Sequence, residues 1–444
     1  MFLPATLVAA FLLVPRELRG WLLIAASLAF YAVAGAGYAL LLAGSVVWVF
    51  GVTASPATPG SRVRLLLAIS VPLAALLVFK YMGFVLGTLA SVPGLAEPRE
   101  SLLHAVALPA GISFYTFTLV AFAVDRFRGE VPLPRFRDFA LYVTFFPHLV
   151  AGPILRYADV RGALDQLSKY RPTAADWSLA AGYFGFGLIA KLLLADGIAA
   201  AAAPFARAPD TLRIDGAMFS TLAYSFQIYF DFYGYSLMAI GLAGLFGFRF
   251  PDNFARPYES LNPREFWRRW HITLSFWIRD YLYVPLGGNR HYIRNMVLVF
   301  SACGLWHGAG GNFVAWGLFH AALVILYRAV HPVWDRLNPL GQRILTFALV
   351  SIGWTLFRYD FGHAAELFRS LVGAGGDAAP NPASWLWLGV VTVVCFTVRP
   401  EPIVAWAQSA PRGVAGAYGV ALGSLVAVSL LFLDRSTDFI YFRF

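Results

Sequence analysis

Charged residues are scarce in this chain of 444 residues, where Asp, Glu, Lys and Arg together make up 13%. An average soluble domain contains about 25% charged residues. Hydrophobic residues make up 59%, with 39 Phe, 20 Tyr and 13 Trp, so lipid is the expected solvent for much of the surface. The alternating polar and apolar pattern of an outer-membrane barrel is also missing. The composition therefore excludes a soluble enzyme and indicates a helical membrane protein.

Cysteine is rare as well: the chain has two, Cys303 and Cys395, and both lie inside apolar runs. They provide neither a disulfide framework nor the spacing of a metal site. The sequence contains no H-E-x-x-H pattern and no G-x-S-x-G nucleophile elbow. We therefore expect no metal ion, no permanently bound cofactor and no Ser or Cys acyl-enzyme.

Long apolar runs are abundant, and many approach or exceed the ~20 residues that span a bilayer as a helix. They predict an all-α polytopic membrane protein with about ten to twelve transmembrane helices in a single domain, residues 1–444. The first run lacks a basic n-region and is interpreted as a short membrane segment, not a cleaved signal peptide. The runs lie at about 2–14, 20–34, 36–54, 63–90, 102–125, 138–155, 177–205, 216–250, 294–330, 341–358, 384–398 and 416–433.

Basic residues indicate the orientation of the chain. The formal net charge is +10, and Lys and Arg gather in windows 126–171 and 251–294. Cytoplasmic loops of membrane proteins carry such an excess, so these windows are predicted to face the cytoplasm, and no nucleic-acid partner is expected. The loops at 91–101, 206–215 and 359–383 are neutral or slightly acidic and are predicted to lie outside.

Two segments, 138–155 and 271–286, have basic residues on both sides. A single crossing would carry one basic flank out of the cytoplasm, against the charge rule. We therefore predict two re-entrant segments that enter the membrane from the cytoplasm and return. Irregular backbone at membrane depth is tolerated only beside protein or a water-filled cavity, so a cavity open to the cytoplasm is expected.

The run 294–330 is too long for one span, because 37 residues of helix extend about 55 Å against a hydrocarbon core of about 30 Å. It contains WHGAGGN, residues 306–312, whose glycines favour a helix break. Two helices meeting near 307–312 are predicted, with His307 about 20 Å into the membrane.

His271 and His307 stand out among the eight histidines, because each follows a tryptophan and lies at a predicted break. An ionisable side chain inside a membrane is costly and is a functional hypothesis by default. A neutral imidazole can take a proton from a hydroxyl group. These two are the candidate catalytic residues, with burial in the core as the alternative. The other six histidines, including His148 and His320, are interpreted as structural or exposed.

Four arginines, Arg264, Arg268, Arg269 and Arg279, surround His271 in the sequence. On a helix, Arg264 and Arg268 share a face. Guanidinium groups bind phosphates well, which would suit a coenzyme A donor. Ordinary cytoplasmic anchors that snorkel to the interface are the alternative, and the sequence leaves both open.

Three long stretches resemble the membrane-bound O-acyltransferases, and in particular the bacterial branch that O-acetylates alginate. They read YSFQIYFDFYGYSLMAIGLAGLFGFRFPDNFARPY, EFWRRWHITLSFWIRDYLYVPLGGNR and GLWHGAGGNFVAWGLFHA. The upstream stretches FFPHLVAGPILRY and KLLLADGIA and the ending DFIYFRF fit the same branch. The resemblance covers nearly the whole chain.

The resemblance implies a multi-helix fold around a central tunnel, with the acyl donor entering from the cytoplasm and the acceptor met from the other side. It implies that His307, in the W-H-G motif, is the catalytic residue and that His271 occupies the partner position. The candidate substrate-binding residues are Arg268, Arg269, Arg279, Asp280, Trp306 and Asn312.

Three positions depart from the usual pattern of that branch. Tyr233 stands where Ser is usual, Leu237 replaces an acid, and Gly311 replaces a bulky residue. They are expected near the tunnel and leave the reaction class intact, while they count against alginate itself as the acceptor.

The expected function is transfer of an acetyl group from cytoplasmic acetyl-CoA by a multi-pass enzyme of the bacterial inner membrane, surrounded by lipid. The acceptor would be a hydroxyl of an exported polysaccharide or of a periplasmic acetyltransferase that relays the group. The first alternative is D-alanyl or other acyl transfer from a carrier protein to a cell-envelope polymer. The second is a transporter or channel, but transporters tend to show two related halves, and the breaks at 147–153 and 307–311 have dissimilar flanks.

Overall fold

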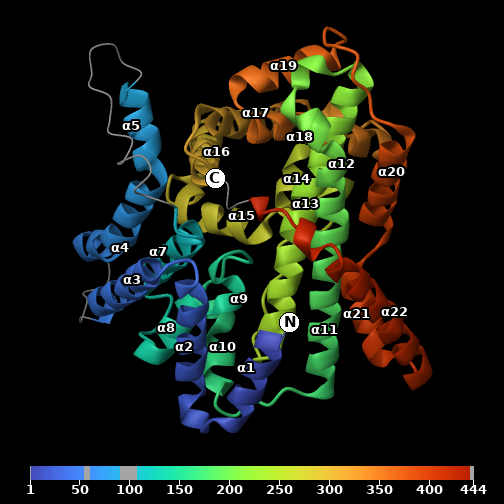
Figure 1. Ribbon diagram of the computed structural model, residues 1–444. Coiled ribbons are helices and arrows are strands. Elements are labelled where there is room, and N and C mark those ends of the chain that lie inside the picture. Colours follow the sequence, from blue (N-terminus) through green and yellow to red (C-terminus); the bar gives the residue numbers. More distant parts are fainter. Residues whose placement is uncertain (1, 55–60, 91–107, 441–444) are drawn as a thin grey trace. The chain divides into compact units, whose positions relative to one another are not determined.

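The computed structural model describes residues 2–54, 61–90 and 108–440 (Figure 1). Within these ranges helices form nearly all the regular structure, and no β-strand occurs, as predicted for an all-α protein. The backbone packs as two compact units, Met1–Ala180 with Ala239–Pro251 and Ala181–Met238 with Asp252–Phe444. That they form one functional domain stays a prediction.

The first unit is built from short and medium helices around an aromatic core. Phe122, Phe139 and Tyr142 are buried there, with Phe122 and Phe139 ring centroids 4.5 Å apart. A π-helical turn, Leu77–Tyr81, joins α4 to α5. The helices are α1 (Phe2–Leu13), α2 (Arg19–Ala32), α3 (Ala36–Ala54), α4 (Arg62–Leu76), α5 (Met82–Ala90), α7 (Ile112–Phe127), α8 (Phe136–Thr144), α9 (Phe146–Leu149), α10 (Tyr157–Gln166) and the start of α11 (Ala174–Leu188).

The second unit contains the rest of α11 and most of α13 (Ile214–Gly244), which is 31 residues long. A π-helical turn, Ile189–Ala195, continues α11 into α12 (Asp196–Arg207). The other helices are α14 (Pro263–Arg269), α15 (Ile272–Ile278), α16 (Tyr292–His307), α17 (Gly311–Trp334), α18 (Pro339–Arg358), α19 (Phe361–Leu371), α20 (Pro382–Thr397), α21 (Pro400–Ser409) and α22 (Arg412–Leu430).

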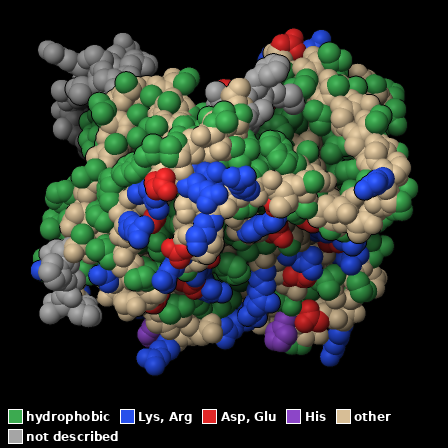
Figure 2. All heavy atoms as spheres, turned by 90° about the horizontal axis from the view of Figure 1, so that it is seen from below, with side chains coloured by type: hydrophobic (Ala, Val, Ile, Leu, Met, Phe, Trp, Pro, Cys, Tyr) green, Lys and Arg blue, Asp and Glu red, His purple; other side chains and the backbone are tan. Residues whose placement is uncertain are grey.

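Among the described residues, six helices are long and apolar enough to cross a membrane, or seven if α20 and α21, bent by 60°, form one broken span. This is fewer than the ten to twelve expected, because several apolar runs are divided into short helices. Apolar side chains are widely exposed on the face drawn in Figure 2, as lipid contact requires. The six are Ala36–Ala54, Arg62–Leu86, Ala174–Arg207, Gly311–Trp334, Pro339–Arg358 and Arg412–Leu430.

Both segments predicted to be re-entrant consist of short helical pieces. In 138–155, α8 is followed by a break at Phe145, by α9, and then by irregular backbone. In 271–286, α15 runs into a π-helical turn, Arg279–Tyr283. Neither forms a continuous span, and their re-entry from the cytoplasm stays a prediction.

The predicted break in 294–330 is confirmed: α16 ends at His307 and α17 begins at Gly311. The two helices pack against each other. A methyl group on Gly304 would collide with the backbone oxygen of Phe313, and one on Gly317 with that of Phe300. Glycine at these two positions therefore allows the close approach that holds the end of α16 in place.

Candidate active site

His307 is the last residue of α16 and is 3% exposed. Three aromatic rings surround its imidazole, with centroid distances of 4.8 Å to Trp306, 5.0 Å to Trp316 and 5.2 Å to Phe357. The helix stops here because Gly308 takes an extended conformation, and a side chain on Gly308 would occupy the position of the Phe313 ring. The turn and the rings together fix the orientation of the imidazole.

His271 lies between α14 and α15 with a φ of +43°, in the left-handed region. Non-glycine residues rarely adopt this conformation, and at functional sites it is often part of the mechanism. The strained backbone is held by Asn253, whose carbonyl accepts a hydrogen bond from the Ile272 amide at 2.9 Å. His271 itself is 1% exposed.

The tautomer of His271 follows from its neighbours. Asn253 Oδ1 accepts hydrogen bonds from the Thr273 hydroxyl at 2.9 Å and the Thr273 amide at 3.4 Å. A backbone amide can only donate, so the Asn253 atom at this point is the oxygen. His271 Nδ1, 3.0 Å from the same oxygen, must therefore carry the proton. In the neutral ring this leaves the Nε2 lone pair as an acceptor.

Trp306 connects the two histidines. Its ring lies 6.2 Å from the His271 ring and 4.8 Å from the His307 ring, centroid to centroid. On another side, Phe232 from α13 packs edge-on against His271 at 4.6 Å. Both imidazoles therefore belong to one packed aromatic cluster.

His271 and His307 line the same cavity, which has a volume of about 360 Å³, within the usual range of small-molecule sites. Arg264, Arg268 and Arg279 line it as well. The remaining lining residues supply polar groups and an apolar wall: Trp267, Trp270, Leu274, Ser275, Ile278, Tyr283, Asn289, Tyr292, Met296, Val299, Phe300, Cys303 and Val324.

The structure thus brings together four of the eight predicted site residues: His307, His271, Arg268 and Arg279. The other four lie outside the described lining of the cavity. Trp306 supports both histidines, whereas Arg269 pairs with Glu265 at 2.6 Å. The Asn312 amide donates to the Leu356 carbonyl, and Asp280 pairs with Arg279. Substrate binding by these four stays a prediction.

Two other histidines are buried elsewhere. His148 Nε2 is 2.9 Å from the Tyr142 carbonyl, which agrees with a structural role. His320 is fully buried, with its ring 5.0 Å from Trp267 and 5.1 Å from Trp316, and it does not belong to the cavity lining.

The positions that depart from the alginate branch are also not part of that lining. Tyr233 and Leu237 line a second cavity of about 270 Å³, which is almost entirely apolar. The Tyr233 hydroxyl donates to Glu401 at 2.6 Å. Gly311 lies next to the Phe361 ring. Tyr233, Leu237 and Gly311 were expected near the acyl-transfer site, but none of them lines the cavity that contains His271 and His307.

Sequence reasoning missed Asn253, which organises His271 from 18 residues away. It also missed Tyr283, Asn289 and Tyr292, which line the cavity. No spacing or periodicity marks these residues. The one available signal was that Asn253, Tyr283 and Asn289 fall within the stretches that resemble a known family.

Comparison with known proteins identifies the family. The family model of the membrane-bound O-acyltransferases (MBOAT) matches residues 95–357. The chain is 38% identical to the probable alginate O-acetylase AlgI of Pseudomonas putida, over 89% of this chain and 83% of the relative. It is 33% identical to the peptidoglycan O-acetyltransferase of Helicobacter pylori, over 80% of this chain and 74% of the relative.

A more distant relative is the teichoic acid D-alanyltransferase of Bacillus subtilis, with 29% identity over 56% of this chain and 68% of the relative. The names of the three relatives give alginate and peptidoglycan with O-acetyl transfer, and teichoic acid with D-alanyl transfer. The matched span includes the His271–His307 cavity. The chain belongs to the membrane-bound O-acyltransferase family, and it is an O-acyltransferase.

Proposed function

We propose that this protein is an enzyme of the bacterial inner membrane that transfers an acetyl group from cytoplasmic acetyl-CoA to a hydroxyl of an exported polysaccharide or of a periplasmic relay protein. The observation that carries the proposal is one cavity lined by two histidines and three arginines. Guanidinium groups suit the phosphates of coenzyme A. An imidazole suits the deprotonation of a hydroxyl.

The reaction needs no covalent intermediate on the protein. His307 accepts the proton of the acceptor hydroxyl, and the oxygen forms a bond to the thioester carbonyl carbon. The carbon–sulfur bond then breaks, and the proton passes from His307 to the leaving thiolate, giving the ester and CoA thiol. His271, with Nδ1 donating to Asn253, accepts a hydrogen bond at Nε2 from an amide N–H of the donor and so orients the thioester.

Transfer of radiolabel from acetyl-CoA to oligomannuronate and to muropeptides, with the purified full chain in detergent, tests the proposal. We expect His307→Ala to reduce transfer to background. His331→Ala is the matched control, because His331 is exposed and its contacts with the Arg328 carbonyl and the Tyr327 ring lie outside the cavity lining, and it should retain the wild-type rate. Full activity of His307→Ala would refute the catalytic assignment.

A second candidate donor is an acyl carrier protein, as the similarity to a teichoic acid D-alanyltransferase suggests. In an acyl carrier protein the acyl thioester lies at the end of a phosphopantetheine arm, as it does in coenzyme A. The same arginines could therefore bind the phosphate of that arm. Supplying D-alanyl-loaded carrier protein in place of acetyl-CoA separates the two donors. Transfer from the carrier protein and not from acetyl-CoA would select this alternative. The transporter alternative receives no support from the family assignment.

A further inference from the structure

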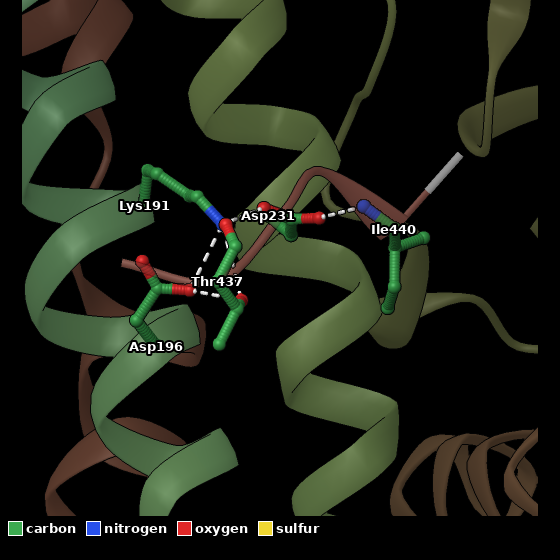
Figure 3. Close-up of polar contacts among 5 residues, drawn as sticks. All are labelled: Lys191, Asp196, Asp231, Thr437 and Ile440. Carbon is green, nitrogen blue, oxygen red and sulfur yellow. Dashed lines mark hydrogen bonds and ion pairs between the residues drawn. The ribbon is translucent and has the colours of Figure 1, made fainter. Parts of the chain in front are cut away.

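The chain segment 436–440 packs against the second unit and buries its last two residues there. It follows a short 3-10 turn, Leu433–Arg435, and runs between α13 and the π-helical turn after α11 (Figure 3). Phe439 is 1% exposed and Ile440 is 3% exposed. The mechanism described above makes no use of this segment.

A buried cluster of one cation and two carboxylates holds the segment (Figure 3). Lys191 Nζ lies 2.9 Å from Asp196 Oδ1 and 2.8 Å from Asp231 Oδ1. The three side chains are 5%, 6% and 3% exposed. Close packing makes this possible: Gly187 and Gly234 face each other, and a side chain on either would meet the backbone of the other.

Each charged group of the cluster also bonds to the segment. Lys191 donates to the Thr437 carbonyl at 2.8 Å, and the Thr437 hydroxyl donates to Asp196 at 2.7 Å. Asp231 accepts from the Ile440 amide at 2.8 Å. Buried charges are tolerated when their remaining hydrogen-bonding capacity is satisfied. The segment therefore supplies a hydrogen-bond partner to each of the three charged groups, and these bonds fix the segment.

The anchored segment reaches the candidate active site through two aromatic contacts. The Phe439 ring lies 5.6 Å from that of Phe232, and Phe232 lies 4.6 Å from the His271 ring at an interplanar angle of 86°. Asp231 and Phe232 are consecutive residues of α13. The helix therefore places the anchor of the segment directly beside the ring that packs on the histidine.

We propose that Lys191 is a positioning residue for acyl transfer. Through its contacts with Asp231 and Thr437 it holds segment 436–440 in place. The Phe439 ring of this segment then packs on Phe232, and Phe232 in turn holds the imidazole of His271 in its orientation. The inference rests on the proposed function in one respect, the participation of His271 in orienting the donor. A displacement of about 1 Å at a catalytic group can reduce a rate about 10²-fold.

The test compares two variants of the full chain in detergent. Lys191→Met/Asp196→Asn removes the ammonium group that holds Thr437 and the carboxylate that accepts its hydroxyl, and leaves the Asp231–Ile440 bond in place. The cluster keeps its net charge of −1, since one positive and one negative group are lost together. Phe439→Ala removes the aromatic contact without altering any charge. We expect each to lower kcat by about 10- to 10²-fold, with the KM for acetyl-CoA within about threefold of wild type, because the arginine lining is unchanged.

Two further variants separate positioning from general stability. Phe219→Ala is the matched control: Phe219 is fully buried in the same unit and contacts Phe205 and Trp385, so it should leave kcat unchanged. Phe439→Leu retains most of the buried volume and should recover most of the lost rate. Wild-type kcat in both Lys191→Met/Asp196→Asn and Phe439→Ala would overturn the proposal.

A readout independent of activity distinguishes this inference from the proposed donor. The imidazole signals of isotope-labelled histidine, with that of His271 assigned by its loss in His271→Asn, should shift in Phe439→Ala and not in Phe219→Ala, because ring currents depend on the Phe232 geometry. An unshifted His271 signal contradicts the positioning role even if acetyl-CoA is not the donor. A wild-type enzyme inactive with acetyl-CoA contradicts the proposed function alone.

Discussion

At the scale of single residues, the candidate site depends on how His271 is held. Its left-handed backbone and its buried ring are both stabilised by Asn253, through the Ile272 amide and through Nδ1. Asn253 is itself fixed, because its side-chain amide donates to the Ser236 hydroxyl at 3.1 Å. One neutral amide therefore selects both the tautomer and the orientation of the imidazole.

Replacement of Asn253 should impair catalysis more than binding. In Asn253→Leu the acceptor for His271 Nδ1 is lost, so the ring can rotate or change tautomer, and we expect a loss of about 10²-fold in kcat. The measurement is the steady-state rate of acetyl transfer against acetyl-CoA concentration. Asn381→Ala is the control, because the Asn381 side chain caps α20 by accepting from the Ser384 amide and hydroxyl, a cap worth about 1 kcal/mol of stability. Equal rates for the two variants would contradict the role of Asn253.

At the scale of secondary structure elements, the site exists because helices stop where they do. The α16–α17 pair ends and restarts within three residues around the glycines that follow His307, and α14 ends just before His271. These terminations place side chains at helix ends, where backbone geometry can be unusual. The close crossing at Gly304 and Gly317 then keeps the two helices of the pair together.

A methyl group at the α16–α17 crossing should destabilise the protein. Gly304→Ala introduces a contact with the Phe313 backbone, which cannot move as a side chain would, and overpacking of this kind costs about 1–3 kcal/mol. The matched control is Gly423→Ala in α22, where an added Cβ meets nothing within 4 Å and helix propensity favours alanine. Thermal unfolding in detergent should show a lower Tm for Gly304→Ala and an equal or higher Tm for Gly423→Ala. The reverse order would show that the crossing is loosely packed.

At the scale of the whole molecule, the composition and the distribution of charge are typical of a protein surrounded by lipid. Apolar helices present large hydrophobic side chains outward, as in α22, where Val420 is 72% exposed. The chain has 34 Lys and Arg residues and 24 Asp and Glu residues, and the basic residues gather in windows 126–171 and 251–294. The distribution of these charges sets the expected orientation in the membrane.

Labelling of single cysteines tests that orientation. In a chain with Cys303 and Cys395 replaced, the exposed positions Arg161 and Arg290, when changed to cysteine, should react with an impermeant maleimide only from the cytoplasmic side. Ala374→Cys, in an exposed loop after α19, should react only from the periplasmic side. Labelling of Ala374→Cys and Arg290→Cys from the same side would contradict the predicted topology.

The sequence by itself determined the helical membrane class, the family and the break after His307. These properties depend on hydropathy, on glycine and proline, and on motifs formed by neighbouring residues, so no knowledge of distant contacts is needed. It also indicated that His271 and His307 can face one cavity, and both residues line the cavity of the structure. Apolar composition alone does not show where individual helices end, and among the described residues six helices, or seven with the bent pair α20–α21, are long and apolar enough to cross a membrane.

Only the tertiary structure decided which polar residues share the cavity with the histidines. Arg268 and Arg269 are adjacent in the sequence, yet the first lines the cavity and the second pairs with Glu265. The bonds from Lys191 to Thr437 join residues 246 positions apart. Such contacts arise from the packing of distant helices, and the identity of a residue and its neighbours in sequence does not specify them.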